Sequence, residues 1–228
     1  RKKIMKILNT VSGLIPGLSR SSCHIGFAAF TTVTVVQCLT APLAHAGHLI
    51  VSSTVSDNVK RYHGTSGAFI DTMASGNGMD NPTGVVFGPD GNLYVGSNFT
   101  DNVKRFDGLT GAFIDNFASG GGLDGPQGMQ FGPDGNLYVA SSVSSNIMRY
   151  NGTTGAFIDT FATGVINPRG LVFGPDSNLY VASLSTDDVK RFNGTTGALM
   201  GTFATGGGMD APVGVTFGPD GKLYVSSN

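Results

Sequence analysis

The sequence predicts an all-β fold, a β-propeller of four-stranded antiparallel blades with about 44 residues per blade. One phrase, FGPDGNLYV in its commonest form, occurs four times, beginning at Phe87, Phe131, Phe173 and Phe217. The spacings are 44, 42 and 44 residues, and a fixed period of this size made of strands and turns is typical of propeller blades. All 15 acidic residues are Asp, and there are 35 glycines. Both features favour turns over helices.

Each repeat predicts four short strands, A to D, joined by turns. In the second repeat, strand A covers residues 82–87, and the Pro-Asp-Gly turn at 89–91 leads into strand B at 93–95. Strand B is an unbroken apolar run, which suits a strand buried on both faces between neighbouring blades. Strand C at 103–106 and strand D at 112–117 follow, separated by a second tight turn. We expect no helix longer than two turns in the repeats.

This reading gives residues 47–228 three whole blades and two partial ones, an incomplete and open array of 17 strands. We expect the strand B side chains to form the core and to be almost fully buried: Leu93, Val95, Leu137, Val139, Leu179 and Val181. A closed ring of four blades is the alternative. We expect the chain to be a fragment of a longer propeller, and its open strand edges favour self-association.

The first 46 residues are predicted to be a secretory signal peptide, which leaves residues 47–228 as the propeller domain. A basic run precedes a mostly apolar stretch from Ile25 to Leu43, and Ala44-His45-Ala46 supplies a small-x-small cleavage site. An uncleaved membrane anchor is the alternative, but the stretch contains several Thr, a Gln and a Pro. We therefore expect an exported protein in the periplasm, at the cell surface or outside the cell, without membrane insertion of the mature chain.

Composition excludes several classes of function for residues 47–228. Both cysteines, Cys23 and Cys38, lie in the leader, which excludes thiol catalysis, cysteine–zinc sites and haem attachment. Nine basic side chains against fifteen aspartates give a net charge of −6, which argues against nucleic acid as a partner. The aspartates of the Pro-Asp turns are spread one per repeat, whereas calcium needs about six to eight converging oxygens. We expect no metal at these turns and no cofactor.

The signature PxGxxFGPDGxLYVxxxxxxxVKRF recurs over residues 47–228 and resembles NHL repeats. More loosely, it is similar to six-bladed lactonase-like and streptogramin-lyase-like propellers. The resemblance implies blades around a central channel, with ligand or protein binding at the channel mouth, where the B–C and D–A loops gather. Gluconolactonases hold a divalent metal with a glutamate, asparagines and an aspartate, and the lyases depend on histidine and glutamate. This chain has no glutamate.

The candidate site lies where the repeats differ. Between the Pro and the Gly of strand A the copies have Thr83, Gln127, Arg169 and Val213, and Asn167 precedes the third Pro. Propeller geometry places these residues at the same height around the channel. We predict a ligand site centred on Arg169, with Gln127, Thr83 and Asn167 beside it. The fork of an Arg side chain favours a carboxylate or another anion.

Two functions fit these observations. The first is a secreted binding scaffold without catalytic residues, whose partner is a protein or a small polar or anionic ligand; the near-identity of the blades favours it. The second is a lactonase-like hydrolase or a streptogramin-lyase-like enzyme, with its catalytic residues and a divalent metal in blades missing from this chain. For Arg169 the alternative is a structural ion pair with Asp187 or Asp124 that only stiffens the rim.

Overall fold

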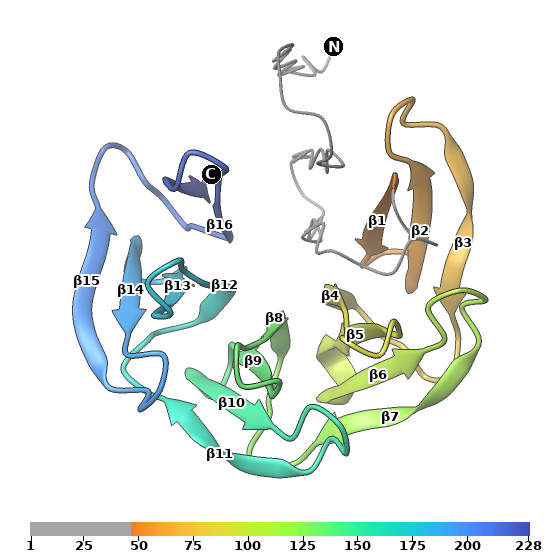
Figure 1. The fold of residues 1–228 in the computed structure, drawn as a ribbon, viewed down its shortest axis with the longest axis horizontal. Coiled ribbons are helices and arrows are strands. Elements are labelled where there is room, and N and C mark those ends of the chain that lie inside the picture. Colours follow the sequence, from red (N-terminus) through yellow and green to blue (C-terminus); the bar gives the residue numbers. More distant parts are fainter. Residues whose placement is uncertain (1–46) are drawn as a thin grey trace, which may run out of the picture.

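The computed structural model describes residues 47–228, which form an open arc of successive sheets (Figure 1). The predicted signal peptide, residues 1–46, lies outside the described residues. One 3₁₀ turn, η2 (Asn98–Thr100), accompanies the strands. The strands are β1 (His48–Ser53), β2 (Asn58–His63), β3 (Phe69–Ser75), β4 (Pro82–Phe87), β5 (Leu93–Ser97), β6 (Asn102–Phe106), β7 (Phe113–Ser119), β8 (Pro126–Phe131), β9 (Leu137–Ser141), β10 (Asn146–Tyr150), β11 (Phe157–Ala162), β12 (Pro168–Phe173), β13 (Leu179–Ser183), β14 (Asp188–Phe192), β15 (Leu199–Thr205), β16 (Gly214–Phe217) and β17 (Leu223–Ser226).

The strand order confirms the predicted fold class. Three four-stranded antiparallel sheets, β4–β7, β8–β11 and β12–β15, lie between a three-stranded sheet, β1–β3, and a two-stranded one, β16–β17. Strand A of each blade faces the inside of the arc and strand D forms its outer rim (Figure 1). Among the described residues, β1 and β17 belong to separate sheets. The alternative of a closed four-bladed ring is therefore wrong for this structure.

The core lies between the blades, as the unbroken apolar run of strand B predicted. All six expected strand B side chains are fully buried. Tyr94 of β5 packs edge-on against Phe117 of its own blade and Phe131 of the next, with ring centroids 4.8 and 5.0 Å apart. Its hydroxyl donates to Asp90 at 2.9 Å, and burial raises the pKa of Tyr94 to about 12. The turn aspartate thus anchors a buried tyrosine, which agrees with a structural role for the turn.

The strand C arginines form ion pairs with aspartates of strand D. Their main partners are strand D aspartates: Arg105 Nε lies 3.1 Å from Asp115 Oδ1, and the pattern repeats in the first and third blades. The turn aspartate is more distant, since Arg105 comes no closer to Asp90 than 4.0 Å. Strand D therefore supplies the counter-ion, because C and D are paired strands with these residues opposite each other.

Candidate functional site

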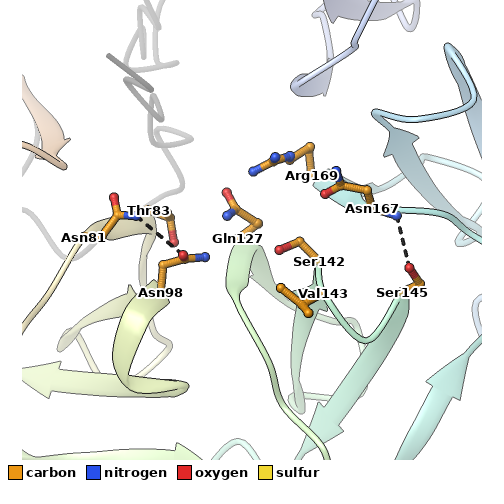
Figure 2. A pocket seen from close by; sticks show the side chains of 9 residues that line it. All are labelled: Asn81, Thr83, Asn98, Gln127, Ser142, Val143, Ser145, Asn167 and Arg169. Atoms are coloured by element: carbon orange, nitrogen blue, oxygen red, sulfur yellow. Dashed lines mark hydrogen bonds between the residues drawn. The ribbon is translucent and has the colours of Figure 1, made fainter. Parts of the chain in front are cut away.

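A polar pocket of about 520 Å³ opens on the inner side of the arc, at the beginnings of strands β4, β8 and β12. All four predicted site residues line it, together with Asn81, which precedes β4, and four residues of the B–C loops (Figure 2). The lining side chains are Asn81, Thr83, Asn98, Gln127, Ser142, Val143, Ser145, Asn167 and Arg169.

A β-bulge in the A strands β4, β8 and β12 explains why the residue between Pro and Gly reaches this pocket. In the third blade, Pro126 pairs with Ser141 and the next pair is Met129 with Val139. Gln127 and Gly128 thus lie opposite a single residue of β9. The second and fourth blades skip the equivalent residues. Because a bulge bends its strand and redirects a side chain, the variable residues of these three blades, Thr83, Gln127 and Arg169, line the pocket. Val213, at the same position of the fifth blade, does not.

Arg169 is the one basic side chain that lines the pocket. Its Nε is buried and has no hydrogen-bond partner among residues 47–228. None of the ion pairs in this range includes it. Burial lowers the pKa of Arg169 from its usual value. The expected alternative, a pair with Asp187 or Asp124, is therefore not formed between described residues, and the guanidinium charge has no protein counter-ion there.

The other three predicted residues differ in their burial and in their contacts. The Gln127 amide extends toward the same space as the Arg169 guanidinium (Figure 2). Asn167 is half-buried and has a left-handed backbone, with φ 52°. Thr83 is buried, and its hydroxyl donates to the Pro126 carbonyl at 2.6 Å. Thr83 thus belongs to the pocket wall and ties two blades together, while Gln127 and Asn167 present polar groups beside Arg169.

Aspartates of the B–C loops hold neighbouring blades together. Asp57, Asp101 and Asp187 each accept the backbone N–H of the residue before the next strand A proline, at 2.8 Å. Ser145 takes this position in the third blade and accepts the Asn167 N–H at 3.3 Å. Each of these three carboxylates therefore already binds a backbone N–H of the next blade.

The junction beside Arg169 differs from the other three. Elsewhere the residue before the bonded N–H is also an aspartate, at Asp80, Asp124 and Asp210, whereas this junction has Ile166. Ser145 and Ile166 therefore replace both rim aspartates where the guanidinium lies. The D–A loop here is two residues shorter, which accounts for the 42-residue spacing. Aligning the loops as well as strand A would have shown this signal in the sequence.

Within residues 47–228 no three His, Cys, Asp or Glu side chains are grouped so that they could hold a metal ion. No helix in this part of the chain is long and apolar enough to cross a membrane.

Comparison with known proteins places the chain among β-propellers. No model of a protein family matches the sequence, and no curated protein matches it. Among solved structures it is similar to virginiamycin B lyase from Staphylococcus aureus, with a TM-score of 0.64 and 17% identity over 82% of this chain and 61% of that one. A streptogramin B lyase gives 0.65 and 18%, over 86% and 66%. A putative gluconolactonase gives 0.68 and 16%, over 89% and 77%.

These similarities define the class by its fold alone, since the identities are low. The chain spans between 61% and 66% of the length of the lyases to which it is similar. The structural neighbours are therefore lactonase-like and lyase-like propellers. What the whole protein acts on or binds has to be argued from the pocket.

Proposed function

We propose that this chain is a binding propeller whose ligand is held at the inner rim by Arg169, with Gln127 and Asn167 beside it. The observation that carries the proposal is the half-buried guanidinium without a carboxylate partner among the described residues. A desolvated cation is stabilised by any anion that reaches it, and a planar guanidinium holds two oxygens of a carboxylate at once. The ligand is accordingly a small polar anion or an anionic group of a protein.

Binding is favoured over catalysis because of the side chains that line the pocket. They are amides, hydroxyls, one valine and one guanidinium, and none of these types titrates near neutral pH as a general acid or base does. We also infer, from the leader pattern and the NHL-like repeats, that the protein is exported and acts as a scaffold outside the cytoplasm. The lactonase-like or lyase-like alternative rests on similarity of fold.

The test is a thermal melt of the chain in which acetate replaces chloride at constant ionic strength. A bound anion stabilises the folded state by RT ln(1 + [L]/Kd), about 2.7 kcal/mol at a hundredfold excess over Kd. We expect acetate to raise the Tm of the wild type but not of Arg169→Gln, whose Tm in chloride should equal that of the wild type. A lower Tm in chloride with an unchanged response to acetate would make Arg169 a structural residue.

A further inference from the structure

The junction between the third and fourth blades has no rim carboxylate, unlike its neighbours. At the second junction, Asp101 accepts a backbone N–H from the following blade and Asp124 lies next to that N–H in the sequence. At the third junction the same two positions carry Ser145 and Ile166. An anion approaching Arg169 therefore meets two fewer negative charges than it would at any other junction of residues 47–228. Since like charges repel, the carboxylates of the other junctions disfavour an anionic ligand there.

The same junction presents exposed apolar surface, part of which lines the pocket of Arg169. Val143, at the tip of the third B–C loop, is 68% exposed and lines the pocket. Ile166 is 54% exposed and directly precedes Asn167 in the chain. Val55 and Phe99 occupy the Val143 position in the first two blades and are as exposed, but they are not part of the pocket lining. Apolar surface and an uncompensated guanidinium thus occur together at this one junction.

We infer that the ligand is a carboxylate attached to an apolar group, and that the Ser145–Ile166 junction selects it. This inference rests on the proposed function. The carboxylate binds the Arg169 guanidinium, the Gln127 and Asn167 amides contact the polar atoms next to it, and the apolar group lies on Val143. A free acyl amino acid and the C-terminal residue of a peptide share this chemistry.

The first experiment compares acetate, N-acetyl-leucine and N-acetyl-leucinamide by calorimetric titration into the whole chain. We expect N-acetyl-leucine to bind about tenfold more tightly than acetate, because burying an apolar side chain contributes this much or more. The amide lacks the charge and should bind about tenfold more weakly than the acid, or worse. A Gly-Gly-Leu peptide with a free carboxyl end then separates the sources: tighter binding than N-acetyl-leucine points to a chain terminus, and weaker binding to a small acid.

Two variants separate the apolar contact from the charge. Val143→Ser should weaken the binding of N-acetyl-leucine several-fold and leave the binding of acetate unchanged. Val55→Ser, at the equivalent exposed position of the first blade, should change the affinity for neither ligand. Ser145→Asp restores the carboxylate of the other junctions and can still accept the Asn167 N–H, as Asp101 accepts its own. The Ser145→Asp variant should have the Tm of the wild type and bind N-acetyl-leucine about tenfold more weakly. Thr153→Asp, in an exposed outer turn, adds the same charge as a control.

The outcomes distinguish the two levels of the proposal. Equal affinity for acetate and N-acetyl-leucine, with loss of both in Arg169→Gln, overturns the apolar selection and leaves the anion site in place. Unchanged binding by Ser145→Asp overturns the role of the missing rim carboxylates. If none of the three probes binds the wild type, the proposed function falls together with this inference.

Discussion

Lys104 of β6 is a buried lysine, which is an unfavourable environment for a charged ammonium group. It is 2% exposed, and its Nζ donates to the Asn116 amide oxygen at 3.0 Å. No ion pair within residues 47–228 includes it, and burial lowers its pKa. The third blade has the buried Met148 at the same position, opposite Thr160. This slot between blades therefore suits an apolar side chain, and the Lys104 ammonium is held there at a cost to stability.

The double variant Lys104→Met with Asn116→Thr copies the third blade into the second. We expect its free energy of unfolding to rise by about 1 kcal/mol or more, because a buried charge and its amide partner are replaced by a pair that the fold already accommodates. Urea denaturation measures this. Lys190→Met is the matched control: Lys190 pairs with the buried Asp188 at 2.6 Å, so its removal should destabilise the protein by about 3–5 kcal/mol. Equal effects of both changes would contradict this account.

The stability of the wild type should depend on pH through the same lysine. Because the folded pKa of Lys104 lies below its unfolded value of about 10.4, the unfolded state binds more protons between the two values. The free energy of unfolding should therefore rise with pH through this window. Urea titrations at neutral pH and near pH 10 should show the gap between wild type and double variant narrowing as pH rises. A constant gap would show that the charge of Lys104 does not carry the effect.

At the scale of the element, most strands could be predicted, and their pairing details could not. The apolar run of strand B and the Asp-Gly turns fix the blade order, because both signals are local. The bulge at Gln127 and Gly128 could not be read from the sequence, since it depends on how β8 meets β9. The partner of Arg105 could not be predicted for the same reason: Asp115 lies opposite it only once β6 and β7 are in register. Four pocket residues could be predicted from the strand A positions where the repeats differ, but Ser145 and Ile166 break the repeat in the loops and needed a comparison of those loops.

Substitution of Gly128 tests how closely the neighbouring inner strands β8 and β12 approach each other. An added Cβ would lie 2.5 Å from the Arg169 carbonyl oxygen and 2.9 Å from the Gly170 Cα, both in the backbone of β12. Gly128→Ala should therefore destabilise the protein by about 1–3 kcal/mol, since two backbones have to separate. Thr153→Ala, at an exposed turn position, is the control and should change stability by about 0.5 kcal/mol or less. Thermal melts of both variants and the wild type measure this difference in stability. If Gly128→Ala melts with the wild type, the strands are not in contact.

At the scale of the whole molecule, the arc exposes strand edges. Within the described residues β17 pairs with β16 alone, and Tyr224 in this two-stranded sheet is about half exposed. An open edge offers unpaired backbone groups to another chain. We propose that the 228-residue chain associates through β17, and expect light scattering to give a mass above the monomer that grows with concentration. Tyr224→Lys places a charge on this edge and should reduce the association. A wild-type monomer at every concentration would contradict the proposal.

The binding of a carboxylate ligand by Arg169 is tested most directly by a crystal structure of the whole chain with N-acetyl-leucine. We expect an open arc of blades, with both carboxylate oxygens of the ligand within hydrogen-bond distance of the Arg169 guanidinium and the leucine side chain on Val143. The contradicting result is a guanidinium already paired with a carboxylate of the protein itself, with the ligand elsewhere or absent.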